Sequence, residues 1–508
     1  MDGGRPCAPE KRKISELMQM GSSSSPPPAT DLGAEGEEFR SRKRRHQSLA
    51  AAGEQGRVDR LSALPDDVVG DILALLPTKE AGRAQVLAKQ YGRIWRRAPL
   101  HLDGCGLPFK DDSLLSAVTR ILASHHGPGR LFSVPGHLLL SHAGTMAAWF
   151  QSPALDGLQE LDLCCRDRMK AGLPFQLHPP PPPPSTFRFW LTLRAVTLSL
   201  CSIPDGVAMA LRFPLLQKLG LVKVNISEGS LHSLIATSPA LECLLLSNSF
   251  GFRRVRINSP TLRSIGVTAS LNLEGAGAIC LEEVVIENAP CLRSFIYPEE
   301  IATDLRVSVI AAPKLETLGL HYCENHSSPI FMFGSTVIQG VNVIKSTEGI
   351  FTIKTLSVNL KNLSLDRVIE LIKCFPCLEK LYIQCERSRE TNCWRRKHRN
   401  LLKSLHMRLK TVVLRIYRHT LAEAQFVRFF ILNAKMMETM VLEGVIRSVY
   451  EAFRAEQYKK LEVDKRACRG ANLYFTARLC REFPYARCVH DLSKKDPYEC
   501  TCPRRSIN

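Results

Sequence analysis

Apolar residues recur in one fixed pattern through the middle of the chain. A proline is followed by any residue, a leucine, two further residues, an apolar residue, one residue and a second apolar residue. Six copies begin at Pro214, Pro239, Pro260, Pro290, Pro313 and Pro376, and the first five begin 25, 21, 30 and 23 residues apart. This spacing is typical of solenoid repeats. Because one copy cannot bury its own apolar side, we expect the copies to stack into a curved solenoid in which each contributes a short strand.

Two segments lie between the fifth and sixth copies, and a third lies before the first copy. The motif lapses between its fifth and sixth copies, which leaves room for two degenerate ones, with Ile350–Ile353 and Leu356–Leu360 as their strands. The segment Leu363–Cys374 then carries apolar residues at helical spacing and predicts a helix. Upstream, six consecutive prolines occupy positions 179–184. We expect them to form an extended, solvated loop between two repeats, in preference to a docking peptide for a polyproline-binding domain.

The last quarter of the chain predicts a strand, a helix and a second strand. The strands are expected over residues 409–416 and 440–443, and the helix over Leu421–Asn433. This helix carries three phenylalanines, which is more aromatic area than a solvated surface helix usually has: Phe426, Phe429 and Phe430. We therefore expect the region to pack on the last repeat and to cover its apolar end.

Residues 59–100 predict two short amphipathic helices separated by a proline. The apolar residues of the first helix are expected on one face: Val68, Val69, Ile72, Leu73 and Leu76. Pro77 ends this helix, and Thr78 is placed to cap a second helix that continues to Trp95. A stretch of about 40 residues closes too small a core to bury all of these groups. Part of this surface must therefore meet another chain.

The same stretch resembles an F-box in its ordered series of residues: Asp59, Arg60, Leu61, Leu64, Pro65, Asp66, Ile72, Leu73, Leu76, Pro77, Thr78, Ala81, Val86, Leu87 and Trp95. The form is that of plant F-box proteins that also carry leucine-rich repeats and a C-terminal FBD domain. The proline-leucine motif matches the repeats of this family, and the helix that ends in Ile431-Leu432-Asn433-Ala434 resembles the FBD domain. The sequence departs from the family at Gln90 and Tyr91, where Arg-Trp is usual.

The resemblance implies an α/β protein in four parts. Residues 1–58 are rich in Ser, Gly, Pro and charge, lack apolar periodicity, and should form a disordered basic arm. A small helical F-box follows at 59–100, and a leucine-rich-repeat solenoid with the proline-rich loop at 101–393. An FBD-like α/β cap at 394–508 continues the solenoid.

F-box proteins of this type are substrate receptors of SCF ubiquitin ligases. The resemblance therefore implies that the F-box binds a Skp-type adaptor and, through it, a cullin, while the solenoid holds an unknown protein substrate. Such a receptor acts by proximity alone and contributes no reacting group and no cofactor. The family's contacts, carried onto matching positions, give residues that face the adaptor or brace that face: Leu64, Pro65, Ile72, Leu73, Leu76, Pro77, Val86, Leu87 and Trp95.

Two other functions are open. A ligase-independent interaction scaffold would use the same solenoid without an adaptor. A nucleic-acid-binding protein would use residues 384–508, which hold 27 Lys and Arg against 13 Asp and Glu in a chain of net charge +19. We favour a solvated basic surface, because no aromatic-interleaved groove or nucleic-acid motif accompanies the charge.

Neither a membrane span nor a signal peptide is predicted, because the chain has no run of 18 apolar residues and its N-terminus has no apolar core. We expect the protein in the nucleus and/or the cytoplasm. Arg42, Lys43, Arg44 and Arg45 have the composition of a nuclear localisation signal. The 18 cysteines are scattered, and in a reducing compartment they are best interpreted as small buried apolar residues.

No motif predicts a metal or catalytic centre. Cys374 and Cys377 form a C-x-x-C that is followed by Cys385, Cys393 and His398. A zinc site is disfavoured, because Cys377 occupies the variable slot of a repeat and Cys374 ends a predicted helix. No phosphate-binding glycine loop, G-x-S-x-G elbow or H-E-x-x-H motif occurs in the sequence.

Overall fold

The computed structural model describes residues 64–87, 89–108, 110–164, 176–268, 277–297, 305–321, 328–346, 348–387, 407–444, 451–476 and 488–499. The chain divides into two units, Met1–Leu64 and Pro65–Asn508, and the elements described here belong to the second. The predicted basic arm at 1–58, with Arg42, Lys43, Arg44 and Arg45, lies outside the described residues.

The second unit is built around one parallel sheet of 14 strands, to which each successive repeat adds its strand at the edge. In sheet order the strands are β1 (Leu100–Asp103), β2 (Gly129–Ser133), β3 (Glu160–Asp162), β4 (Ala195–Ser199), β6 (Lys218–Val222), β8 (Cys243–Ser247), β10 (Ser264–Thr268), β12 (Ser294–Ile296), β14 (Thr317–His321), β18 (Thr355–Asn362), β19 (Lys380–Arg387), β20 (Thr411–Tyr417), β21 (Thr439–Gly444) and β22 (Asn472–Thr476). The six copies of the motif give β6, β8, β10, β12, β14 and β19, so the predicted solenoid is confirmed.

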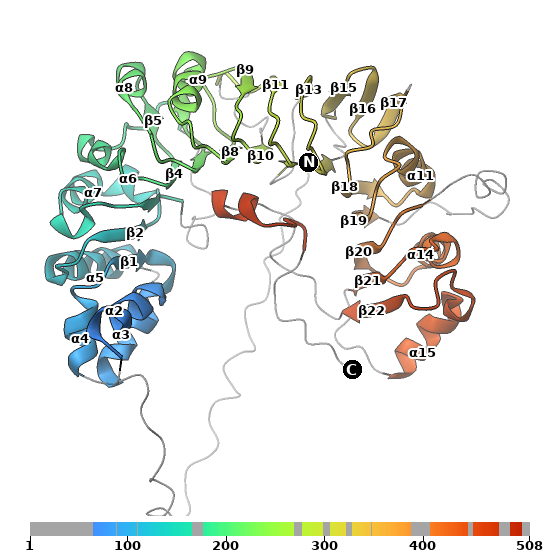
Figure 1. Ribbon diagram of the computed structural model, residues 1–508, viewed down its shortest axis with the longest axis horizontal. Helices are drawn as coiled ribbons and strands as arrows, with labels where there is room; N and C mark the ends of the chain where they lie inside the picture. The colour runs from blue at the N-terminus through green and yellow to red at the C-terminus, as the bar shows by residue number, and fades with distance from the viewer. Residues whose placement is uncertain are drawn as a thin grey trace, which may run out of the picture. The chain divides into compact units, whose positions relative to one another are not determined.

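The apolar positions of the motif form a continuous core between the sheet and the helices. In the first copy Leu216, Leu219 and Leu221 are buried, and the equivalent residues of the other copies belong to the same core. Figure 1 shows the sheet along the inside of an arc within this unit, with α8, α9, α11 and α14 on the outer side. From β1 onward the described helices are η1 (Gly104–Gly106), α5 (Asp111–Ser124), α6 (Leu138–Ser141), α7 (Ala143–Phe150), η2 (Pro153–Leu155), η4 (Pro184–Phe189), α8 (Asp205–Ala210), α9 (Glu228–Ala236), α11 (Leu365–Cys374), α14 (Leu421–Asn433), α15 (Glu451–Lys460), η5 (Val463–Lys465) and η6 (Val489–Ser493).

A second sheet replaces helices on the outer side of the middle repeats. Its order is β17 (Asn342–Lys345), β16 (Thr336–Gln339), β15 (Ile330–Phe333), β13 (Arg306–Val309), β11 (Glu283–Asn288) and β9 (Arg254–Asn258), and a two-stranded sheet pairs β5 (Ser202–Ile203) with β7 (Asn225–Ile226). The antiparallel hairpins β15 to β17 occupy the stretch in which two degenerate repeats were predicted. Among the described residues of this stretch, only β18 joins the main sheet, and it pairs directly with β14.

The strand predicted at Ile350–Ile353 is therefore wrong. The Ile350 backbone N–H donates to the carbonyl of Cys374 (2.8 Å), which ties this segment to the end of α11 and not to a neighbouring strand. Ile353 is buried whereas Phe351 is exposed, so an alternation that resembles a strand arises here in an ordinary loop. The helix predicted at Leu363–Cys374 is confirmed as α11.

Residues 179–183 form a loop as predicted, with an extended backbone at Pro183, but Pro184 already begins η4 and the loop is not fully solvated. Pro179 and Pro182 are buried. The carbonyl of Pro180 accepts a hydrogen bond from the Ser202 backbone N–H (3.0 Å), which fastens the loop beside β5. Proline lacks an N–H but keeps a full acceptor, so such a run can still pair along one side.

The F-box region forms three helices in place of the predicted two: α2 (Asp66–Leu75), α3 (Thr78–Leu87) and α4 (Lys89–Trp95). Thr78 was expected to cap α3, but its side chain serves another purpose. Its hydroxyl donates to the carbonyl of His101 (3.0 Å) and accepts from the backbone N–H of Asp103 (2.6 Å). These two bonds fasten α3 to β1, the first strand of the solenoid.

The variant Thr78→Val should lower the free energy of opening of α3 by about 1–3 kcal/mol. A buried hydroxyl that bridges two backbone groups is lost with little change in volume. Hydrogen exchange of the α3 amides measures the effect. The control Thr237→Val removes a hydroxyl that bonds only within its own helix end, to the carbonyl of Ser233 (2.9 Å). An α3 protected equally in Thr78→Val and in the unmodified chain would contradict the assignment.

The C-terminal region continues the solenoid, as the sequence predicted. Helix α14 has the predicted bounds, and Thr420 and Glu423 form a capping box at its start. Strand β20 pairs in parallel with β19, and β21 pairs with β20, so these strands extend the repeat sheet without a break.

Candidate functional site

Helix α2 has two apolar faces, and one of them is exposed. Val69 and Leu73 are buried against the rest of the unit. Three other apolar residues of α2 follow one another at helical spacing with exposed fractions of 43%, 37% and 64%: Val68, Ile72 and Leu75. We call these three residues the α2 row. The prediction of a single apolar face was wrong, because adjacent apolar pairs such as Val68 and Val69 point in different directions around a helix.

The nine residues predicted to contact or brace an adaptor divide between surface and core. Leu64, Pro65, Ile72 and Pro77 are exposed, Leu76 is half-buried, and Leu73 and Trp95 are buried in the core; the side chains of Val86 and Leu87 lie outside the described residues. The prediction missed Val68 and Leu75 as members of the exposed row. Their spacing from Ile72, four residues before it and three after it, was the signal that could have found them.

The buried members hold the helices against the solenoid. The Trp95 ring meets the His125 ring edge to face, with centroids 5.2 Å apart. His125 Nε2 lies 2.8 Å from the carbonyl oxygen of Ala98, a distance for hydrogen bonding. Burial lowers the pKa of His125, so the ring stays neutral and can pack beside Trp95. Helix α2 packs on α4, which carries Trp95, so these contacts also support the helix that bears the α2 row.

The inner face of the main sheet, on the inside of the arc, is a second candidate surface. It carries an apolar cluster that draws on several repeats and includes Val222, Leu245, Ile296 and Tyr382. The segment of residues 488–499, which we call the C-terminal segment, lies against this face (Figure 1). Sequence reasoning placed the segment in the C-terminal cap and missed its contact with the repeats.

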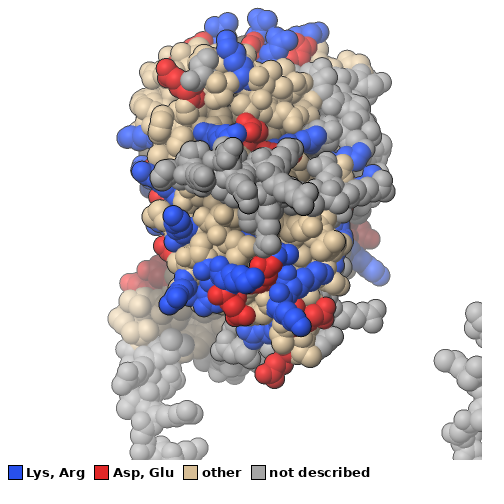
Figure 2. All heavy atoms as spheres, turned by 90° about the vertical axis from the view of Figure 1, so that its right-hand side faces the viewer, with Lys and Arg blue, Asp and Glu red and all other residues tan. Residues whose placement is uncertain are grey.

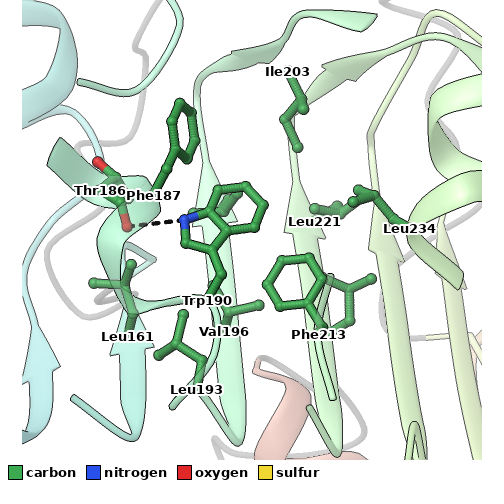
Figure 3. Close-up of a pocket in the computed structure, with 12 residues that line it drawn as sticks. Leu161, Thr186, Phe187, Trp190, Leu193, Val196, Ile203, Phe213, Leu221 and Leu234 are labelled. Atoms are coloured by element: carbon green, nitrogen blue, oxygen red, sulfur yellow. Dashed lines mark hydrogen bonds between the residues drawn. The ribbon is translucent and has the colours of Figure 1, made fainter. Parts of the chain in front are cut away.

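A cavity behind the sheet belongs to the core and not to a ligand site. It has a volume of about 20 Å³ and is lined by apolar side chains of the early repeats, including Leu161, Val196 and Leu221 (Figure 3). Trp190 stacks on Phe213 (4.7 Å) and donates from its indole Nε1 to the Thr186 carbonyl (3.1 Å). A cavity of this size holds about one water molecule.

Among the described residues there is no group of three His, Cys, Asp or Glu side chains that could hold a metal ion. Cys374 and Cys385 are buried, whereas Cys393 and His398 lie outside the described part of the chain. Burial raises the pKa of Cys385 to about 11, so its thiol stays protonated. No helix within the described ranges is both long and apolar enough to span a membrane.

In the basic C-terminal quarter, acidic side chains lie among the basic ones. Figure 2 shows Lys and Arg spread among Asp, Glu and other residues on the side of the molecule that carries α11, α14 and α15. Several of the basic groups are paired: Lys410 lies 3.0 Å from Glu379, Lys465 lies 3.2 Å from Glu462, and Arg428 also pairs with Glu462. This pattern fits the solvated basic surface that the sequence favoured.

Two family models match the chain. One, described as FBD-associated F-box protein At5g56370, LRR repeats, matches residues 146–383, and the FBD model matches residues 397–442. The first range covers the strands from β3 to β18 and the start of β19, and the second covers β20, α14 and most of β21.

Several Arabidopsis thaliana proteins are similar to the chain. The FBD-associated F-box protein At3g50710 is 25% identical over 261 residues, which are 47% of this chain and 55% of that protein. The F-box/LRR-repeat protein At3g03360 is 24% identical over 319 residues, 59% of this chain and 61% of that protein. The chain spans about half the length of the curated relatives it matches. On its repeats, its FBD domain and these relatives, the chain belongs to the plant family of F-box proteins that carry leucine-rich repeats and an FBD domain.

Proposed function

We propose that this chain is the substrate-recognition subunit of an SCF-type E3 ubiquitin ligase. In this role the F-box binds a Skp-type adaptor and, through it, a cullin, and the solenoid binds a protein substrate. The observation that carries the proposal is the α2 row, in a chain of the F-box/leucine-rich-repeat/FBD family. A contiguous apolar row on a surface helix is costly in water and is typical of a protein-binding site.

The proposed role is not catalytic. A receptor that binds both the adaptor and the substrate raises the effective concentration of a substrate lysine near a ubiquitin-charged enzyme. Positioning of this kind accelerates transfer without a reacting group from the receptor. We further propose that the protein works in the nucleus and/or the cytoplasm, with Arg42-Lys43-Arg44-Arg45 as its import signal.

The double variant Val68→Glu/Ile72→Glu should lower the affinity for a purified Skp-type adaptor at least about 100-fold, because two carboxylates would be buried in the apolar contact. Both side chains are exposed, so the melting temperature should not change. Isothermal titration calorimetry on the full chain measures the binding.

The matched control is Leu191→Glu, at an exposed leucine on the solenoid, far along the chain from α2. It should bind the adaptor like the unmodified protein. If the unmodified chain binds no adaptor, the ligase-independent scaffold becomes the better proposal. If it binds and Val68→Glu/Ile72→Glu binds equally well, the contact lies elsewhere in the F-box.

A further inference from the structure

The C-terminal segment, Cys488–Glu499, is anchored to the inner face of the sheet at three points. The first anchor is apolar: Val489 and Leu492 on η6 are fully buried and belong to one cluster with Val222 and Leu245. Between them, His490 Nδ1 lies 3.3 Å from Lys218 Nζ on β6. Helix η6 thus contacts β6, β8 and β10, which lie more than 200 residues earlier in the chain (Figure 1).

The second anchor is a carboxylate. Asp496 Oδ2 accepts hydrogen bonds from Lys380 Nζ (2.7 Å) and from the Tyr382 hydroxyl (3.0 Å), both on β19. The Asp496 side chain is only 8% exposed, so its carboxylate is shielded from water, whereas the Lys380 side chain is 37% exposed and stays partly hydrated. Burial alone would lower the pKa of Lys380, but the bond to Asp496 and its charge outweigh burial and raise it. Lys380 and Tyr382 therefore form a specific carboxylate clamp.

The third anchor is an aromatic ring. Tyr498 is 3% exposed, and its ring lies 5.6 Å from that of Tyr382. A Cβ atom added to Gly319 would lie 2.5 Å from the Tyr498 hydroxyl oxygen and 3.4 Å from the Tyr297 backbone nitrogen. Gly319 lies within β14 without a positive φ, so the backbone does not require glycine there. A glycine inside a strand often marks the close approach of another group, and here it leaves a slot for the ring.

We propose that the clamp of Lys380 and Tyr382, with the slot over Gly319, is a docking site for a protein segment that carries an aspartate two residues before a tyrosine. The chain's own Asp496-Pro497-Tyr498 fills this site intramolecularly, and a partner protein with the same chemistry takes its place. The inference rests on the proposed function only in regarding that partner as a substrate. Its test contains no adaptor and no ubiquitin, so the two proposals fail separately.

The test measures binding of a fluorescent peptide that copies Cys488–Glu499 to the full chain, by fluorescence anisotropy. The tethered segment competes at an effective concentration of about a millimolar, so the unmodified chain should bind the peptide weakly. The variant Leu492→Asp/Asp496→Asn/Tyr498→Ala changes only the C-terminal segment and leaves the sheet side intact. It should bind the peptide at least about tenfold more tightly than the unmodified chain.

Addition of Gly319→Ala to this variant should reverse the gain, because the methyl group closes the slot. The matched control Gly229→Ala adds a methyl group on α9 where no atom lies within 4 Å, and it should leave the peptide affinity unchanged. Equal affinities of the triple variant and the unmodified chain, or a tight complex that tolerates Gly319→Ala, would overturn the proposal.

A second measurement uses the unmodified chain and does not depend on the fold of any variant. An excess of isotopically labelled peptide should speed hydrogen exchange in residues 488–499 of the chain as the peptide takes their place. A labelled peptide with Asp496→Asn and Tyr498→Ala should not. If hydrogen exchange in residues 488–499 is equally fast with the native peptide, with the altered peptide and with no peptide, the segment is a permanent part of the fold and the docking proposal fails.

Discussion

A chain that ends at Arg387 should aggregate, or melt at a sharply lower temperature than the full chain. The cut removes β20, β21 and β22 and leaves the edge of β19 without its parallel partner from Lys380 to Gln384. An exposed strand edge is a template for pairing with other chains. In the full chain β19 lies between β18 and β20, so the cut turns an interior strand into an edge strand.

The cut also removes the apolar cover of the last repeats. Phe426, Phe429 and Phe430 on α14 are fully buried, and Phe430 lies 5.2 Å and 5.1 Å from the other two rings. Each buried aromatic side chain contributes about 1.5–3 kcal/mol through the area it removes from water. The same cut exposes the apolar side chains of the last repeat, because terminal units of a solenoid are needed to cover it.

A chain that ends at Thr476 is the matched control, since it lacks the C-terminal segment but keeps β20, α14, β21 and β22. It should stay soluble with a cooperative melting transition. Light scattering and calorimetry on both chains measure the difference. A monomeric chain ending at Arg387 with the melting temperature of the control would mean that the C-terminal region is an independent module.

Local patterns decided which parts of the fold were predictable. The repeat strands and α14 were predicted because each unit's apolar spacing is set within about 25 residues and matches its own secondary structure. The hairpins β15 to β17 were not predicted, because their antiparallel pairing replaces a repeat and leaves no periodic pattern in the sequence. The exposed α2 row was predicted only in part, because Val68 and Val69 look alike in sequence and differ only in the direction they face.

The contact between the C-terminal segment and the sheet was not predictable from pattern. Lys380 and Asp496 are 116 residues apart, and Lys218 and His490 are 272 apart, with no repeat to relate them. Gly319 carried a weak signal, because it stands inside a strand of a repeat and glycine weakens a strand; Gly220 in β6 and Gly266 in β10 stand at the same position of their repeats. A strand glycine with no turn to explain it is a reason to look for a group that approaches closely.

Either Arg415→Leu or Glu443→Leu should destabilise the C-terminal strands by about 3–5 kcal/mol, because each removes one charge of a buried ion pair and keeps the other charge buried. Arg415 on β20 and Glu443 on β21 are register partners, and Arg415 Nε donates to Glu443 Oε2 at 2.9 Å. Their side chains are only 4% and 8% exposed. Hydrogen exchange of the β20 and β21 amides measures the loss locally, which suits a solenoid that need not unfold in one step.

The double variant Arg415→Leu/Glu443→Leu should lower the free energy of unfolding of these strands by less than either single variant does. It removes both desolvated charges and leaves apolar side chains in their place. The pair Lys410 and Glu379 is the matched control: it also bridges neighbouring repeats, at 3.0 Å, but both side chains are 38% exposed. Its loss should cost less than about 1 kcal/mol, because solvent screens an exposed pair. If Arg415→Leu and Glu443→Leu cost no more than this control and their effects simply add, the two charges are hydrated in solution and do not depend on one another.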